Sequence, residues 1–379
     1  MKILTIFGTR PEAIKLSPVL DKLSSTPQVE SFICTTGQHR DLLDEMLSFF
    51  KIVPAYDLNL MRYNQRPEDI IAASLTRLER VIQDVKPDWI LVQGDTVTVL
   101  AASLAAFFKK IKLAHIEAGL RSYDKFSPFP EETNRRLVSH MTDLHFAPTL
   151  QAKKNLLAEN IPEKNILVTG NTAIDNILNV CQKIKQKKLL VKKIQKKFPF
   201  LNKKRRLILA TIHRRENFGK KLENVAKAFI TITRKNHDSQ IILPVHPNPN
   251  VRIPLTQFLQ KSAIYLVQPL DYPSFIYLMD SAYLLMTDSG GIQEEATALG
   301  KPVLILRDVT ERPEIVEARI GLLTGTNQSR IVKTALRLLN DQKTYQSIAR
   351  KVNIFGDGLA SQRIVSGLLG KKVKEFEPF

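Results

Sequence analysis

The chain reads YLLMTDSGGIQEE over residues 283–295. An apolar run, two glycines and a helical pattern of small residues follow one another, which predicts a strand, a tight turn and a helix start. Short apolar runs alternate with helical patterns along the rest of the chain as well. Such alternation is typical of parallel strands joined by right-handed helical crossovers, so we expect an α/β protein.

The alternation occurs twice, before and after a crossing point near residues 166–172. A chain of 379 residues also exceeds the size at which one core usually keeps growing. We therefore expect two doubly wound units, over residues 1–170 and 171–360. The expected strands are 3–7, 31–35, 89–92 and 112–116 in the first unit, and 207–211, 240–245, 265–267, 283–287 and 302–306 in the second. Ligands of such sheets bind beyond the carboxyl ends of the strands, and two facing sheets would enclose a cleft.

The glycine turn in residues 283–295 has the features of a phosphate-binding site. A helix start offers unpaired N–H groups and the positive end of the helix dipole. Gly290 and Gly291 let a phosphate approach this backbone, and Ser289 can both cap the helix and donate to an oxygen. Glu294 or Glu295, one turn further on, can accept hydrogen bonds from a ribose. We therefore expect a nucleotide-linked substrate.

Composition excludes several classes of protein. Of the residues, 44% are hydrophobic, yet no run of about 18 apolar residues occurs. The chain starts directly with an expected strand at residues 3–7, so we predict neither a signal peptide nor a membrane span, and a cytoplasmic location. Cys34 and Cys181 are too few for a disulfide framework and are expected to be reduced and structural.

The net charge of +19 raises the question of nucleic-acid binding. Much of the excess lies between Lys183 and Arg206, where basic pairs surround apolar residues in the pattern of an amphipathic helix with a solvated face. No helix-turn-helix, zinc spacing or aromatic RNA-binding motif accompanies it. We expect no specific nucleic-acid partner, although the charge can attract anionic substrates.

Polar residues follow the first expected strand at Gly8-Thr9-Arg10-Pro11-Glu12-Ala13-Ile14-Lys15. Arg10 supplies a planar fork suited to phosphate, and Lys15 a mobile point charge. The alternative interpretation is a capped helix with two solvated cations. The stretch is neither a P-loop nor a dinucleotide-binding fingerprint, which argues against kinase-like and NAD-dependent chemistry.

Acidic residues follow other strand ends. Asp95 and Glu117 come just after two expected strands, and Glu131 with Glu132 opens a helix after a proline-braced loop. Acids in a first helical turn often only complement the dipole, but several acids at one cleft suit proton removal and return. His213 ends another strand, where it could assist a leaving phosphate or simply bond to backbone. No metal-ligand spacing occurs among these residues, so we predict no metal and no other cofactor.

These residues together resemble one known family, the non-hydrolysing UDP-N-acetylglucosamine 2-epimerases. The resemblance spans nearly the whole chain, and the combination is specific although each motif is weak. The motifs, in order, are GTRPEAIK at 8–15, QGDT at 93–96, HIEAGLR at 115–121, PEETNR at 130–135, HRREN at 213–217, TDSGGIQEE at 287–295 and TERPE at 310–314.

The resemblance implies a glycosyltransferase-B-like fold in which the final segment, 361–379, forms a helix that packs on the first domain. Such enzymes interconvert UDP-N-acetylglucosamine and UDP-N-acetylmannosamine for surface polysaccharides, usually as homodimers. Matching motifs place the catalytic group at Asp95, Glu117, Glu131 and His213. The matching UDP-binding positions are Arg10, Lys15, Phe275, Ser289, Gly290, Gly291, Glu295 and Arg312.

The family's mechanism suits this set of residues. The sugar C2–H is weakly acidic, so direct deprotonation with UDP still attached is costly. Anti elimination of UDP to 2-acetamidoglucal, followed by re-addition, avoids that step. The acids would manage protons, with their assignment to the two faces left open, and a cleft that closes would retain both fragments. A hydrolysing epimerase, a retaining glycosyltransferase and a basic nucleic-acid-binding protein are the rival interpretations.

The family often has a second, activating UDP-N-acetylglucosamine site. The positions that match it are Gln38, His39, Arg40, Arg214 and Glu216. The loop at 61–67 departs from the family pattern, because Asn64 aligns near the position of an arginine, for which Arg62 or Arg66 could substitute. We expect allosteric activation at this site.

Overall fold

The computed structural model describes residues 1–37, 40–60, 65–259 and 264–378. Two compact units are formed, Met1–Asn176 with Phe355–Pro378, and Ile177–Ile354. The sequence-based boundaries at 170 and 360 lie a few residues away. Helix α7 (Thr172–Gln186) starts in the first unit and continues into the second, so its helical pattern offers no break at the boundary.

The first unit contains a seven-stranded parallel sheet in the order β3-β2-β1-β4-β5-β6-β7. Its strands are β1 (Lys2–Phe7), β2 (Glu30–Thr35), β3 (Tyr56–Asp57), β4 (Trp89–Gln93), β5 (Lys112–Ile116), β6 (Leu144–Ala147) and β7 (Ile166–Val168). The strand order reverses between β1 and β4, where Ile3 lies opposite Trp89. This reversal is where open α/β sheets bind ligands.

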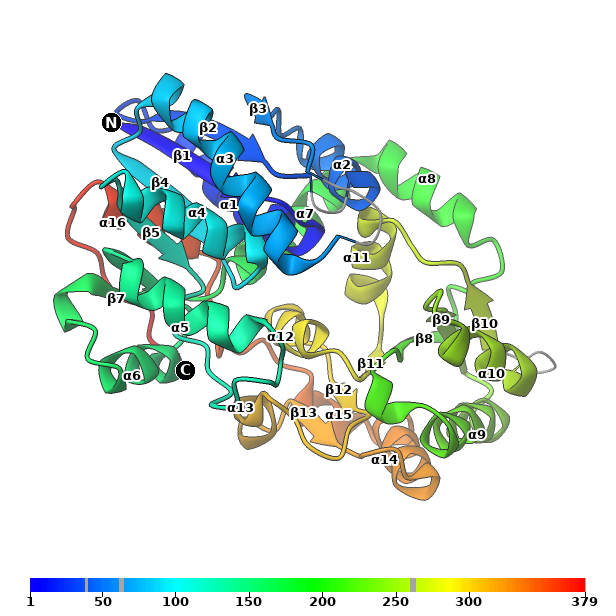
Figure 1. Ribbon diagram of the computed structural model, residues 1–379. Coiled ribbons are helices and arrows are strands. Elements are labelled where there is room, and N and C mark those ends of the chain that lie inside the picture. The colour runs from blue at the N-terminus through cyan, green and yellow to red at the C-terminus, as the bar shows by residue number, and fades with distance from the viewer. Residues whose placement is uncertain (38–39, 61–64, 260–263, 379) are drawn as a thin grey trace. The chain divides into compact units, whose positions relative to one another are not determined.

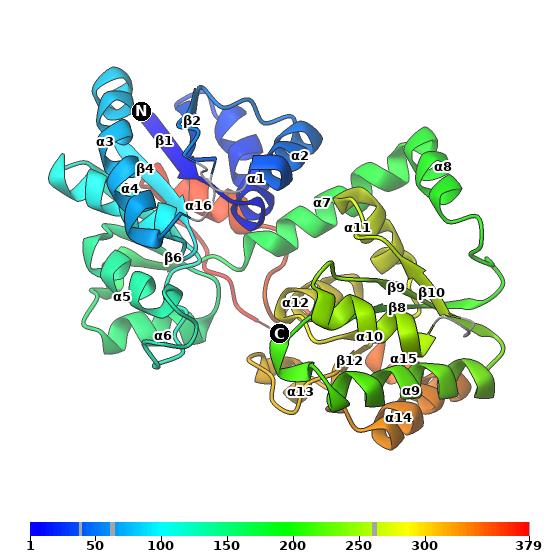
Figure 2. The same ribbon diagram turned by 45° about the vertical axis from the view of Figure 1, so that its right-hand side comes forward.

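Helices cover this sheet in two groups (Figures 1 and 2). One group packs α3 (Pro67–Val85), α4 (Val97–Phe108) and α5 (Glu131–Met141) side by side. The other packs α1 (Arg10–Ser24) against α2 (Arg40–Phe50) and α16 (Ala360–Leu368). The remaining elements are α6 (Leu150–Ala158) and the short 3-10 helix η1 (Glu163–Asn165). With both faces covered, β1 is buried from Ile3 to Phe7, as its continuous apolar sequence requires.

The second unit repeats this plan with a six-stranded parallel sheet, in the order β10-β9-β8-β11-β12-β13. Its strands are β8 (Arg206–Thr211), β9 (Ser239–Pro244), β10 (Ile264–Val267), β11 (Leu284–Thr287), β12 (Val303–Ile305) and β13 (Gly321–Leu323). Its helices are α8 (Lys188–Lys197), η2 (Arg215–Asn217), α9 (Lys220–Lys235), α10 (Pro249–Leu259), α11 (Tyr272–Ser281), α12 (Gly290–Leu299), α13 (Pro313–Glu317), α14 (Gln328–Asn340) and α15 (Gln342–Ile348). The expected α/β class with parallel sheets is confirmed, and the second reversal lies between β8 and β11.

Two sequence-based expectations need correction. The basic stretch from Lys183 to Arg206 is not one helix, because α7 ends at Gln186, α8 ends at Lys197, and an irregular segment then leads into β8. The expected strands also omit β3, β6, β7 and β13, which the structure contains. All four are short, and the sequence of such strands resembles that of any brief apolar run.

The two cysteines are buried thiols, and Cys34 and Cys181 form no disulfide. Burial raises the pKa of each thiol to about 12, so both are inert at neutral pH. Among the described residues, no helix combines the length and the apolar character that a membrane crossing requires.

Gly119, two residues after Glu117, is a position where only glycine fits. Its φ is +88°, and an added Cβ would lie 2.2 Å from the carbonyl oxygen of Ala152. Gly370, in the same unit, has a φ of +66°, but a Cβ added there would meet nothing within 4 Å among the described atoms. Comparing substitutions at the two glycines therefore separates the cost of steric overlap from the cost of backbone strain.

We expect Gly119→Ala to lower the free energy of unfolding by about 2 kcal/mol more than Gly370→Ala does, because the first change adds overpacking to the same strain. Denaturant unfolding followed by circular dichroism measures both losses. Equal losses for the two variants would show that the backbone at Ala152 moves aside at little cost.

Candidate active site

The turn after β1 is tied to the turn after β4 by Glu12. Its carboxylate accepts hydrogen bonds from the backbone N–H of Gly8 at 2.9 Å and of Thr9 at 2.7 Å, and from the Thr96 hydroxyl at 2.7 Å. Thr9 is the N-cap of α1, so Glu12 completes a capping box. Burial raises the pKa of Glu12 above its usual value. Arg10 is thus held, half-buried, in the first turn of a braced helix.

Glu12 is not among the expected site residues, although the Thr-x-x-Glu spacing of a capping box is visible in the sequence. A capping box is a common structural feature, and only the contact with Thr96 shows that it joins two strand ends.

The carboxylate of Glu117 is held by two side chains. Lys15 donates to both of its oxygens, at 2.6 and 2.7 Å, and the Gln93 amide donates at 2.6 Å. Glu117 has a φ of +65°, an uncommon conformation for a residue other than glycine. Backbone strain of this kind is found at functional sites. The structure therefore pairs Lys15 with an acid of the expected catalytic group.

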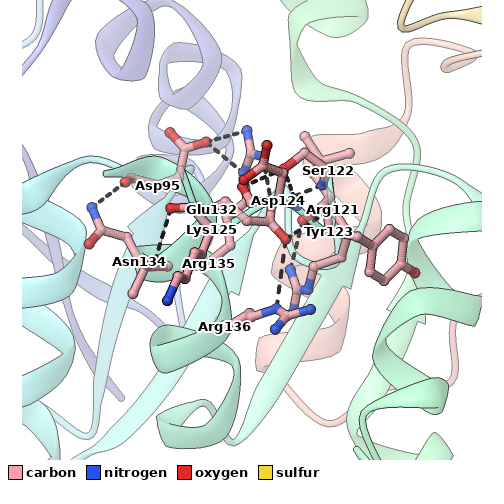
Figure 3. A network of polar contacts seen from close by, with 12 residues as sticks. Asp95, Arg121, Ser122, Tyr123, Asp124, Lys125, Glu132, Asn134, Arg135 and Arg136 are labelled. Atoms are coloured by element: carbon pink, nitrogen blue, oxygen red, sulfur yellow. Dashed lines mark hydrogen bonds and ion pairs between the residues drawn. The ribbon is translucent and has the colours of Figure 1, made fainter. Parts of the chain in front are cut away.

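Asp95 lies in a network with the start of α5 (Figure 3). Arg135 donates from Nε to its carboxylate at 2.8 Å, and Asn134 donates to its backbone oxygen at 2.9 Å. Since Gln93 lies opposite Ile116 in the sheet, Asp95 and Glu117 follow adjacent strand ends. Neighbouring parallel strands thus bring these two acids to one edge.

The adjacent acids Glu131 and Glu132 have different surroundings. Glu132 is fully buried and accepts hydrogen bonds from the N–H groups of Ser122 and Tyr123, at 2.9 and 3.1 Å, while pairing with Arg135 (Figure 3). Glu131 is half-buried, and its Oε2 is a buried atom with no hydrogen-bond partner in the described part of the protein. Glu132 therefore fixes the loop, whereas Glu131 has an oxygen available for chemistry.

His115 is a structural histidine. Its Nε2 lies 2.7 Å from the backbone oxygen of Gly94, and its ring is buried. Burial lowers the pKa of His115 to about 4, so the ring is neutral at physiological pH.

In the second unit, Asp288 organises the turn after β8. This fully buried carboxylate accepts from the N–H groups of His213 and Arg214, at 3.0 and 2.8 Å, and from the Asn217 amide at 3.0 Å. His213 Nδ1 lies 3.3 Å from the same carboxylate, and its ring stacks on His246. Burial lowers the pKa of His213, against the opposing effect of Asp288. Asp288 belongs to the TDSGGIQEE motif, but the sequence pattern does not predict this bracing function.

Helix α12 starts at Gly290, directly after β11, with Ser289 as its N-cap. The Ser289 side chain makes no capping hydrogen bond, which corrects that part of the expectation. The first turn contains no acidic residue, and a Cβ on Gly291 would meet nothing within 4 Å among the described atoms. A helix start of this kind offers unpaired N–H groups that can bind an anion.

Further along α12, Glu294 is buried and forms an ion pair with Arg312 Nε. Of the two acids considered for a ribose, Glu294 is thus engaged with an expected UDP-binding residue, and Glu295 is half-buried beside it. Gln293 accepts a hydrogen bond from the Thr310 hydroxyl at 2.7 Å, which brings the TERPE segment to this helix. Phe275 lies half-buried on α11.

The expected second site is described only in part. Gln38 and His39 lie outside the described residues, and of Arg40 only its place in α2 is described. Glu216 accepts a hydrogen bond from Arg307 at 2.6 Å, and Arg214 Nε is buried without a hydrogen-bond partner in the described part of the chain. Of the two possible substitutes in the 61–67 loop, Arg62 lies outside the described residues, and Arg66 pairs with Asp69 at the start of α3.

Within the described residues, no group of three His, Cys, Asp or Glu side chains is placed to hold a metal ion.

The sequence matches, over residues 21–369, a protein family described as UDP-N-acetylglucosamine 2-epimerase. A UDP-N-acetylglucosamine 2-epimerase of Salmonella typhimurium is 46% identical over 374 residues, which are 98% of this chain and 100% of that protein. The crystal structure of UDP-GlcNAc 2-epimerase from Neisseria meningitidis bound to UDP-GlcNAc has a TM-score of 0.89 and 45% identity, covering 98% of this chain and 100% of that one.

A more distant relative has the same fold. The crystal structure of the Methanocaldococcus jannaschii UDP-GlcNAc 2-epimerase in complex with UDP-GlcNAc and UDP has a TM-score of 0.78 and 36% identity, with 98% of this chain and 100% of that one covered. The resemblance found in the sequence is confirmed. The chain belongs to the UDP-N-acetylglucosamine 2-epimerase family.

Proposed function

We propose that the protein is an isomerase that interconverts UDP-N-acetylglucosamine and UDP-N-acetylmannosamine at C2, without net hydrolysis. The observation that carries this proposal is the 46% identity to a UDP-N-acetylglucosamine 2-epimerase over 98% of the chain. The titles of two related structures name UDP-GlcNAc as their ligand, which supports the same substrate here. The product would serve as a precursor of surface polysaccharides.

The proposed reaction is an anti elimination followed by re-addition. The C1–O bond breaks with its electron pair leaving on UDP, while a carboxylate removes the C2 proton, giving 2-acetamidoglucal. UDP then attacks C1 again, and a proton is delivered to the opposite face of C2. In this route the C2 proton is not removed while UDP is still attached to C1. Its largest requirement is therefore stabilisation of the departing diphosphate.

Residues of both units are suited to these tasks. The first turn of α12, beginning at Gly290, offers N–H groups to the diphosphate, and Arg10 and His213 add polar or charged donors. Asp95, Glu117 and Glu131 would remove and return the proton. Two observations support this proton chemistry: Glu131 Oε2 has no hydrogen-bond partner among the described residues, and cationic partners hold Asp95 and Glu117.

The same proposal includes a second, activating UDP-N-acetylglucosamine site near Arg214 and Glu216, and a homodimeric state. Arg214 lies directly beside His213, on the turn that Asp288 fixes. Binding at such a site would therefore be coupled to binding of the diphosphate. Rates of the reaction that starts from UDP-N-acetylmannosamine should rise when a little UDP-N-acetylglucosamine is added.

For the proposed homodimer, light scattering should give twice the mass of one chain.

Exchange with solvent tests the proposed reaction directly. In deuterium oxide, with UDP-N-acetylglucosamine and neither acceptor nor metal, we expect UDP-N-acetylmannosamine carrying deuterium at C2, because the proton returned to C2 comes from a carboxylate that equilibrates with solvent. NMR of the product measures the label. Recovery of unlabelled substrate alone would contradict the proposal, and free N-acetylmannosamine would indicate a hydrolysing enzyme.

A further inference from the structure

A cavity lies in the Ile177–Ile354 unit, at the opposite end of the sheet from the first turn of α12. Its volume is about 830 Å³, and Leu207, Gln240 and Tyr283 line it at or just before the starts of β8, β9 and β11. The first turn of α12 follows the carboxyl end of β11 instead. The cavity is therefore separate from the residues proposed to hold UDP.

The lining of this cavity is strongly basic. Six of the residues that line it are cations, and none of the described lining residues is acidic: Lys192, Lys196, Lys203, Arg205, Arg206 and Lys301. In the described part of the chain, none of these six forms an ion pair with a carboxylate. Two lysines of the same region that do not line it behave differently, since Lys185 pairs with Asp280 at 2.8 Å and Lys197 pairs with Asp271. The six lining cations therefore lack a carboxylate in ion-pair contact among the described residues, although Asp280 acts electrostatically on Lys301.

Aromatic and apolar side chains form the rest of the lining. Phe198 is buried, and the rings of Tyr283 and Tyr345 stack with their centres 3.8 Å apart. The Tyr345 hydroxyl donates to the backbone oxygen of Tyr283 at 3.0 Å. The guanidinium of Arg206 lies 4.8 Å from the centre of the Tyr283 ring. An apolar, aromatic lining with unpaired cations suits a ligand that is flat at one end and anionic at the other.

Hydrogen bonds fix the walls in place. Gln195 on α8 donates to the Tyr277 hydroxyl on α11 at 2.8 Å. Gln240, at the start of β9, accepts from the N–H of Asn202 at 2.9 Å and donates to its carbonyl oxygen at 2.7 Å. Helix α8 is therefore fastened to α11, and the irregular segment that follows it is fastened to β9. A cavity with anchored walls is the kind that binds small molecules.

We propose that this cavity binds an organic anion that carries a planar ring, of the chemical class of nucleoside phosphates, at a site distinct from that for UDP. Its volume lies within the range of about 300–1,000 Å³ that is usual for small-molecule pockets. The cations would hold the phosphates, and the apolar part of the lining would receive the ring. This assigns a binding function to the basic segment that follows Lys183.

Isothermal titration calorimetry with the full chain tests this site. ATP is titrated without divalent cations into the wild-type chain and into Gly291→Asp, which places a carboxylate on the first turn of α12 where UDP is proposed to bind, and adenosine and tripolyphosphate are titrated in the same way. ATP should bind at least about tenfold more tightly than either fragment, because only ATP combines ring and charge. Equal binding of tripolyphosphate and ATP would show a mere anion patch, and loss of ATP binding in Gly291→Asp would place ATP at the UDP site; either result overturns the proposal.

Matched variants locate the binding. Lys301→Met and Lys203→Gln each remove a lining cation, whereas Lys193→Gln removes a lysine of α8 that does not line the cavity. The first two should weaken ATP binding about tenfold or more, and the third less than about twofold. Lys203 and Lys193 are both exposed, so this pair remains informative if Lys301→Met folds poorly. Equal effects of Lys203→Gln and Lys193→Gln would reduce the binding to general electrostatics and refute the site.

Discussion

Glu131→Gln should lower kcat by about 10²–10⁴-fold while leaving the affinity for UDP and the thermal stability nearly unchanged. The physical reason is that Glu131 Oε2 has no hydrogen-bond partner among the described residues, so the amide replaces an acid without breaking a contact of that oxygen. Glutamine keeps the shape of the side chain but cannot accept and return a proton at neutral pH. Steady-state kinetics in both directions, with UDP titration calorimetry, measures the two quantities.

The neighbouring acid provides the control. Glu132→Gln changes the same functional group one residue later, but Glu132 is buried and accepts two backbone hydrogen bonds while pairing with Arg135. We expect this variant to lose about 1–3 kcal/mol of unfolding free energy, because a buried charge pair and charge-assisted hydrogen bonds are weakened. A Glu131→Gln enzyme with normal turnover would remove Glu131 from the proposed proton chemistry.

Gly291→Asp should weaken UDP binding by about 100-fold, which corresponds to about 2.7 kcal/mol. The variant places a carboxylate on the first turn of α12, where the diphosphate is proposed to bind. The same charge interacts favourably with the helix dipole, and the added Cβ meets no described atom within 4 Å, so the protein should be slightly more stable rather than less. Loss of affinity combined with unchanged or higher stability is the specific signature of this arrangement.

Gly291→Ala separates charge from size at this position. It adds the Cβ alone, so it should keep most of the UDP affinity while gaining about 0.5–1 kcal/mol of helix stability. Calorimetry with UDP and thermal unfolding of both variants measure these effects. UDP affinity that is the same in Gly291→Asp and Gly291→Ala would mean that the diphosphate binds elsewhere.

The elements of the site follow from local patterns. The run YLLMTDSGG predicts a strand and a helix start from local signals alone, since apolar continuity and glycine act over a few residues. Asp95 and Glu117 are found after strands for the same reason, and parallel strands bring such residues to one edge. Some short strands, such as β13, are not predicted, because three residues carry little pattern of their own.

The partners of those residues depend on long-range contacts. Glu131 and Glu132 are identical and adjacent in the sequence, and only the packing of α5 places one against the N–H groups of Ser122 and Tyr123. Likewise, Glu294 and Arg312 are distant in sequence and meet only in the folded chain.

The sequence by itself therefore determined the α/β class, the strand ends that carry polar residues, and the family to which the chain belongs. The tertiary structure alone decided that Glu12 and Asp288 brace the turns, that Glu132 is structural, and that the basic segment lines a cavity. The reason is that periodicity and turn chemistry act between near neighbours, whereas burial and hydrogen-bond partners are set by residues far apart in the chain.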